Sequence, residues 1–179
     1  MKINTIVILT LSILLSSFSI AQKIPQLELT TNGVEPIVVK VDDMNASKIY
    51  KKAKNWVKET YKNPDKVLKA DITNKKIIIS GYASNAWSYK TFISRNTFDM
   101  EYRIEISFKD GRYRFEFIPG QFYTGNGQKV LYDYESFFKR NGKVKKTYSE
   151  APPTMEETMN DLSQSFFDYV SGKVLEDDW

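Results

Sequence analysis

The 179-residue chain contains no cysteine and no histidine. Without cysteine the fold cannot contain a disulfide, so its stability must come from packing. The same two absences remove the imidazole general base and the thiol nucleophile, and they exclude metal sites built from histidine or cysteine. No carboxylate spacing matches a calcium-binding loop. We therefore assign no catalytic, cofactor-binding or metal-binding residue from the sequence.

The first 21 residues have the form of a secretory signal. A short positive start at Lys2 precedes the apolar run 3–18, and Ser19 and Ala21 place small side chains where signal peptidase acts. We expect cleavage between Ala21 and Gln22 and export to the periplasm or the medium. An uncleaved anchor is the alternative, although the apolar run is shorter than the roughly 20 residues of a membrane-spanning helix. The missing cysteine excludes a lipoprotein.

Removing this segment leaves 158 of the 179 residues, which is the size of one compact domain. The formal net charge of +4 is too small to indicate nucleic acid or a membrane surface on its own. Aromatic residues are plentiful, with 11 Phe, 11 Tyr and 3 Trp, as expected where packing is the only source of stability. We expect an irregular leading segment over 22–36, a single domain over 37–175, and an acidic tail over 176–179.

The first half of the domain begins with a strand and a helix. The β-branched run 37–41 predicts a strand, and Asn45 is the best helix N-cap after it. Apolar residues recur at helical spacing over 46–61, and Asn63-Pro64 ends the helix. Two further strands are expected over 66–72 and 76–82. Residues 83–96 are typical either of a strand extension or of an exposed loop.

The hairpin over 97–122 is the clearest local prediction. Apolar residues alternate strictly with polar ones from Phe98 to Phe108, which indicates a strand with one solvated face. Asp110-Gly111 predicts a type I′ turn. This turn would place three apolar pairs opposite one another: Phe108 and Tyr113, Ile106 and Phe115, and Ile104 and Phe117.

A second helix is expected near the C-terminus. Residues 122–153 contain turn residues around a short apolar piece, and Thr154 to Glu157 has the form of a capping box. Helical spacing continues to Val174. The predicted order β-α-β-β-β-β-α favours an α+β fold, a curved antiparallel sheet with two amphipathic helices on one face. Its core should include Trp56, Ile104, Ile106, Phe115, Leu162 and Phe166.

Several runs of residues resemble a known family. They are Lys54-Asn55-Trp56-Val57 with Tyr61-Lys62-Asn63-Pro64, then 76–81, 102–106, and Lys109-Asp110-Gly111-Arg112-Tyr113-Arg114, which is the most specific. They resemble a domain-of-unknown-function family common in exported proteins of Bacteroidota and described as having a TATA-binding-protein-like (TBP-like) fold. The similarity covers about 37–175 and excludes 122–154. It implies a fold but no activity, because fold does not carry function.

One enzymatic hypothesis rests on the solvated face of the hairpin. This face should carry Glu101, Arg103, Glu105, Arg114 and Glu116, with Glu105 opposite Glu116. If this pair is desolvated, the repulsion between the two carboxylates raises the pKa of one of them. Two carboxylates at the right separation can hydrolyse a glycosidic bond. A hydrolase that uses only carboxylates is therefore one alternative.

The other hypothesis is a binding surface in the ambiguous segment 83–96. Trp87, Tyr89 and Phe92, with Lys90 and Arg95 beside them, would form a partner surface if they are exposed. The competing interpretation buries Trp87 and Phe92 in the core. Our leading interpretation is an exported, non-enzymatic domain that binds an envelope protein or an apolar or anionic ligand. We expect no cofactor, no nucleic-acid partner and no stable membrane anchor after cleavage, and a purely structural envelope component is a further alternative.

Overall fold

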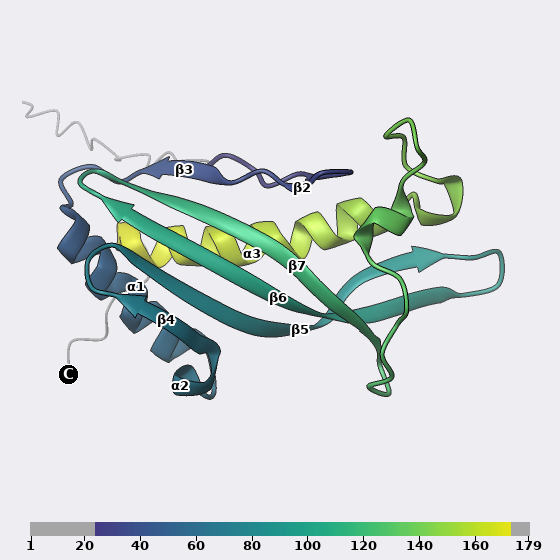
Figure 1. The fold of residues 1–179 in the computed structure, drawn as a ribbon, viewed down its shortest axis with the longest axis horizontal. Helices are drawn as coiled ribbons and strands as arrows, with labels where there is room; N and C mark the ends of the chain where they lie inside the picture. The colour runs from purple at the N-terminus through teal and green to yellow at the C-terminus, as the bar shows by residue number, and fades with distance from the viewer. Residues whose placement is uncertain (1–23, 173–179) are drawn as a thin grey trace, which may run out of the picture.

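The computed structural model describes residues 24–172, which form an α+β fold around a five-stranded antiparallel sheet (Figure 1). The strand order is β3-β7-β6-β5-β4. The expected cleavage site and the expected acidic tail lie outside the described residues. The strands of this sheet are β3 (Ile37–Lys40), β4 (Leu68–Ile72), β5 (Lys76–Lys90), β6 (Arg95–Lys109) and β7 (Arg112–Thr124).

The helices α1 (Ala46–Thr60) and α3 (Ala151–Ser171) both lie on one side of this sheet (Figure 1). The predicted order and layering are therefore confirmed, with the four-residue helix α2 (Pro64–Val67) in addition. Asn45 caps α1 as predicted, because its side chain accepts a hydrogen bond from the Lys48 N–H at 2.9 Å. Five of the six expected core residues are buried, and the sixth, Leu162, is half-buried at the edge of the core.

The β6–β7 hairpin has the predicted register, since all three expected apolar pairs face one another. The type I′ turn was wrong. That turn needs a positive φ at both central residues, and here Gly111 has φ 70° whereas Asp110 does not lie in that region. Asp110 is held by helix α1, because its Oδ1 accepts a hydrogen bond from the Ala46 N–H at 2.8 Å.

Residues 83–90 extend strand β5, and a tight turn over 91–94 leads into β6. A bulge between Ala83 and Trp87 interrupts the β5–β6 register, and Asn85 there has φ 54°. Asp99 on β6 stabilises this bulge, since its Oδ1 accepts the Asn85 N–H at 2.8 Å. Beyond the bulge the hairpin continues away from the central sheet, so its turn lies at one end of the molecule (Figure 1).

Helix α3 begins one turn earlier than the expected capping box. Its first residue is Ala151, and Pro152 and Pro153 follow in the first turn, where a helix needs no backbone N–H donor. Thr154 lies inside the helix, and its Oγ1 accepts a hydrogen bond from the Ser88 N–H at 3.0 Å. The hydroxyl thus joins the helix to strand β5 instead of capping it. The helix ends at Gly172, with φ 78°.

The leading segment is packed, not loose. Ile24, Leu27 and Leu29 are buried, and the short strands β1 (Leu29–Thr30) and β2 (Gly33–Val34) form a hairpin. The side chain of Asn160 on α3 accepts the Leu27 N–H at 2.8 Å and donates to the Leu27 carbonyl at 3.0 Å. Regular alternation is absent here because the segment is held by side chains of α3, with the Leu29 N–H also donating to Glu156 Oε1 at 2.8 Å, and its two strands are only two residues long.

The segment between β7 and α3 contains the 3-10 turns η1 (Tyr134–Phe137) and η2 (Lys146–Tyr148). Phe137 is fully buried and its ring centroid lies 4.8 Å from that of Trp87. This segment therefore covers the core beyond the β5 bulge, at the same end of the molecule as the 91–94 turn (Figure 1).

Candidate binding site

The side of the sheet opposite α1 and α3 is solvated, and we call it the open face. Strand alternation and register place its side chains in rows that run across the strands. The rows are Lys40, Arg112 and Lys109; then Val38, Arg114, Ser107 and Lys76; then Glu116, Glu105 and Ile78; then Ile118, Arg103 and Ser80; and finally Glu101 and Tyr82.

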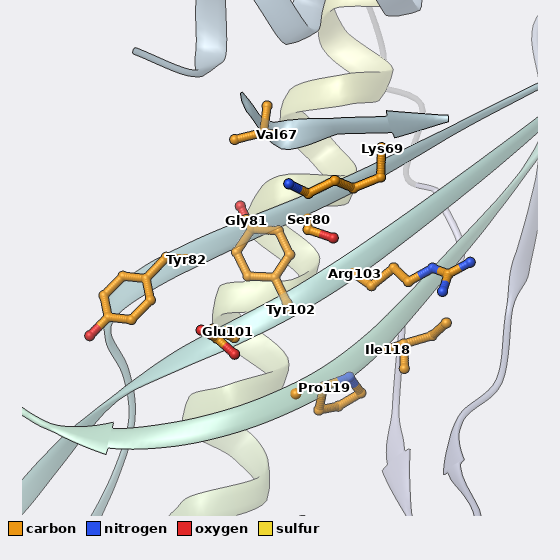
Figure 2. A pocket seen from close by; sticks show the side chains of 11 residues that line it. Val67, Lys69, Ser80, Gly81, Tyr82, Glu101, Tyr102, Arg103, Ile118 and Pro119 are labelled. Atoms are coloured by element: carbon orange, nitrogen blue, oxygen red, sulfur yellow. The ribbon is translucent and has the colours of Figure 1, made fainter. Parts of the chain in front are cut away.

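A hollow of about 540 Å³ lies on the open face where the β6–β7 register shifts, and we call it the bulge pocket (Figure 2). Two glycines shape it. A Cβ at Gly81 would lie 2.3 Å from the Tyr102 Cζ, and a Cβ at Gly120 would lie 2.8 Å from the Glu101 carbonyl oxygen. A side chain at either position would therefore force its neighbours to shift. The pocket is lined by Val67, Lys69, Ser80, Gly81, Tyr82, Glu101, Tyr102, Arg103, Ile118, Pro119 and Gly120.

Apolar side chains are exposed around this pocket. Tyr82 on β5 is 49% exposed and Ile118 on β7 is 39% exposed, although Ala83 and Phe117 beside them pack in or against the core. Two cationic side chains, Lys69 and Arg103, line the same hollow (Figure 2). Its volume lies within the range of small-molecule sites, and its lining combines apolar surface with a few polar groups.

Hydrogen bonds to carboxylates fix two tyrosines beside the pocket. Tyr82 donates to Asp99 Oδ2 at 2.8 Å, Tyr123 donates to Glu101 Oε1 at 3.0 Å, and the two ring centroids are 5.9 Å apart. Desolvation and the hydrogen bond to Asp99 raise the pKa of Tyr82 to about 12. The Tyr82 hydroxyl therefore remains a hydrogen-bond donor at neutral pH.

A second hollow, of about 280 Å³, lies at the other end of the open face, beside the Asp110-Gly111 turn. It is lined by Val38, Ser107, Lys109, Arg112, Tyr113 and Arg114. Arg112 lies opposite Lys40 on one side and opposite Lys109 on the other. Like charges directly opposite one another destabilise a sheet, so this row of three cations is unfavourable for folding.

The proposed carboxylate pair is present, but its electrostatics differ from those that the hydrolase hypothesis requires. Glu105 lies opposite Glu116 as predicted. Lys76 Nζ lies 2.7 Å from one oxygen of Glu105, and Arg103 lies 2.6 Å from the other. The hydrogen bond from Lys76 and the nearby cations lower the pKa of Glu105 below its ordinary value. The raised pKa of a general acid is therefore not found at Glu105.

The predicted partner surface is divided between the core and solvent. Trp87 is fully buried and stacks on Phe98 with centroids 4.3 Å apart, and Tyr89 is half-buried, so their proposed exposure was wrong. The bulge explains the difference, because it turns Trp87 toward the aromatic cluster under η1. Phe92 is fully exposed with Ile93 beside it, Lys90 is exposed, and Arg95 pairs with Glu150 at 2.8 Å.

Sequence reasoning did not find the bulge pocket. Alternation within each strand could have placed Tyr82 and Ile118 on the solvated face, where an apolar residue is unexpected. The pocket also needs the β6–β7 register shift and the positions of Gly81 and Gly120, which no local pattern specifies. Within residues 24–172 no group of three or more carboxylates could hold a metal ion, and no helix is long and apolar enough to cross a membrane.

The fold is that of an α+β domain whose open sheet face carries two hollows. Residues 37–119 match the family described as "Domain of unknown function (DUF4468) with TBP-like fold". This part of the chain, from β3 to the bulge in β7, is therefore a DUF4468 domain. It includes most of the bulge pocket and all residues of the second hollow.

Two solved structures share this fold. A DUF4468 family protein from Bacteroides ovatus is similar over 83% of this chain and 88% of its own, with a TM-score of 0.54 and 16% identity. A TBP-like protein from Parabacteroides distasonis is similar over 76% of this chain and 90% of its own, with a TM-score of 0.53 and 16% identity. No curated protein matches the sequence.

Proposed function

We propose that this chain is an exported, non-enzymatic binding domain that holds a small amphiphilic ligand in the bulge pocket. The observation that carries the proposal is the exposure of Tyr82 and Ile118 on either side of a 540 Å³ hollow. These two side chains lie on β5 and β7, on either side of β6, and their exposed apolar surface costs solubility without adding to the core. A ligand that removes them from water would recover that free energy.

The polar lining favours a ligand that also carries an anionic group. Lys69 and Arg103 both border the pocket, and a guanidinium has five N–H donors, so Arg103 can bind Glu105 and still donate to a ligand. Glu101 is also present, but the Tyr123 hydroxyl already donates to one of its oxygens. A carboxylate or sulfonate attached to an apolar body fits this arrangement best.

The pocket is rigid before any ligand arrives. Asp99 fixes the Tyr82 hydroxyl, and the same carboxylate fixes the backbone of the β5 bulge at Asn85. A preformed site loses little conformational entropy on binding, which favours affinity. The signal-like N-terminus supports export, and the lowered pKa of Glu105 supports a binding role over hydrolysis.

A fluorescent apolar anion, 8-anilinonaphthalene-1-sulfonate, tests the proposal. Titration of the parent protein should give saturable enhancement of fluorescence with one site. Ile118→Ser should weaken binding about tenfold, because it removes apolar contact. Ile72→Ser is the matched control: Ile72 is 51% exposed on edge strand β4 but does not line the pocket.

Equal loss of dye binding in both variants, or in neither, would exclude the bulge pocket as the site. Arg103→Gln tests the contribution of the ligand's anionic group separately from that of its apolar body. If the anionic group binds here, this variant weakens the sulfonate dye but leaves an uncharged naphthyl analogue unchanged. Equal effects on both dyes would restrict the site to apolar ligands.

A further inference from the structure

The turn over residues 91–94 carries two of the three most exposed large apolar side chains in the described part of the chain, the third being Leu131. Phe92 is 105% exposed and Ile93 is 92% exposed, and they are adjacent. The turn joins β5 to β6 where the hairpin extends beyond the central sheet (Figure 1). We call Thr91, Phe92, Ile93 and Ser94 the hairpin tip. Its apolar side chains contribute nothing to the packed core.

Three of the four backbone N–H groups of the tip are hydrogen-bonded within the turn itself. The Thr91 N–H donates to the Ser94 carbonyl at 2.7 Å, and Thr91 Oγ1 accepts the Ser94 N–H at 3.0 Å. The Ile93 N–H also points to Thr91 Oγ1, at 3.4 Å. A backbone group that already has a partner loses little when water is removed, so these three N–H groups add little to the cost of moving the turn into an apolar medium.

Cationic side chains lie behind the apolar residues. Lys90 is exposed immediately before the tip, and Arg95 after it pairs with Glu150. The adjoining segment 125–150 carries six Lys and Arg residues against three Asp and Glu, so this end of the molecule is positively charged. A bilayer surface presents the matching order: an apolar interior and then anionic headgroups.

We propose that the hairpin tip inserts Phe92 and Ile93 into the surface of a bilayer containing anionic lipid. Two convex side chains offer far less area than the roughly 800 Å² per partner of a stable protein interface, whereas a bilayer needs no shape complementarity. One apolar turn with a basic surround gives reversible attachment. The domain would then be held at a membrane with its open face accessible, and this inference is independent of the ligand in the bulge pocket.

Vesicle flotation tests this inference. The protein is recovered after export, and its N-terminus is verified by mass spectrometry so that the apolar run 3–18 does not contribute. The parent should float with phosphatidylglycerol–phosphatidylcholine vesicles and weakly with phosphatidylcholine alone. Phe92→Ser combined with Ile93→Ser should weaken binding at least tenfold, by loss of both apolar side chains. Lys90→Gln should weaken it about fivefold at low salt.

Ile72→Ser is again the control, because it removes an exposed apolar residue far from the tip in sequence and should leave flotation unchanged. A Phe92→Trp variant adds a direct readout, since its added fluorescence should shift to shorter wavelength only with anionic vesicles. Flotation that is unaffected by the double substitution would overturn the proposal. Absence of flotation, with crosslinking from position 92 to a protein in envelope extract, would also overturn it and identify a protein partner. Dye binding at the bulge pocket should persist in every tip variant.

Discussion

The same strands build both faces of the sheet, but the two faces differ in every property. On the side covered by the helices, Ile104, Ile106 and Phe115 are fully buried. On the open face, most residues one position away are charged, and the exposed apolar residues Val38, Tyr82 and Ile118 lie around hollows. Burial therefore restricts every second residue of these strands, and the remainder is available for recognition. The predictions below compare the two faces, beginning with the largest effect.

Phe115→Ala should lower the free energy of unfolding by about 3–5 kcal/mol, because the side chain is fully buried beneath α3. Ile118→Ala on the same strand should cost less than about 1 kcal/mol, since Ile118 lies on the open face. Urea unfolding followed by circular dichroism measures both. Similar costs would contradict the assignment, because they would mean that Ile118 on the open face stabilises the fold as much as the buried Phe115.

Gly81→Ala should destabilise the protein by about 1–3 kcal/mol through overpacking. The added Cβ would overlap the Tyr102 ring, whose hydroxyl lies 3.0 Å from that of Tyr61. Gly125→Ala is a control, because nothing lies within 4 Å of a Cβ there and its φ is not positive. In thermal unfolding, Gly81→Ala should melt at a lower temperature than Gly125→Ala. Equal melting temperatures would contradict the close approach of Gly81 to the Tyr102 ring.

Glu105→Gln should reduce stability more at pH 7 than at pH 3. The folded-state pKa of Glu105 is lowered, so its contribution is present above the unfolded-state value of about 4.3 and is lost as pH falls. For a partly solvated ion pair the effect at pH 7 should be about 1 kcal/mol or less. Denaturant midpoints at the two pH values test the sign, and an equal deficit at both would refute it.

Arg112→Thr should stabilise the fold by a few tenths of a kcal/mol at low salt. The substitution removes the central cation of the row with Lys40 and Lys109 and places a β-branched residue in a strand. The electrostatic part of the gain should vanish at about 1 M salt, where charges are screened within 3 Å. A loss of stability at low salt would mean that an unrecognised counter-ion supports this row.

The sequence allowed prediction of the parts of the fold that depend on local periodicity. Alternation from Phe98 to Phe108 predicted the hairpin register, and Asn45 was recognised as a cap because it precedes a regular apolar pattern. The start of α3 was misplaced because Thr154 resembles a cap, whereas its partner is Ser88, far away in the sequence. The resemblance to the family supplied the fold independently.

The binding face was less predictable because it depends on interruptions of periodicity. The bulge at Ala83–Trp87 moved Trp87 into the core, and the shift at Met100–Tyr102 opened the bulge pocket. Bulges arise from competition between distant strands and leave little local signal. Phe92 was correctly noted as a candidate exposed residue, but nothing in the sequence separated it from the buried Trp87.

The contact between the leading segment and α3 also determines when folding can finish. Leu27 and Asn160 are 133 residues apart in the chain. Closing so long a loop is entropically costly, and contacts at such separation slow folding. A chain that leaves a channel with its N-terminus first therefore leaves Leu27 and Leu29 without their partners Asn160 and Glu156 until α3 has emerged. The packing of the first hairpin waits for a helix that is made more than a hundred residues later.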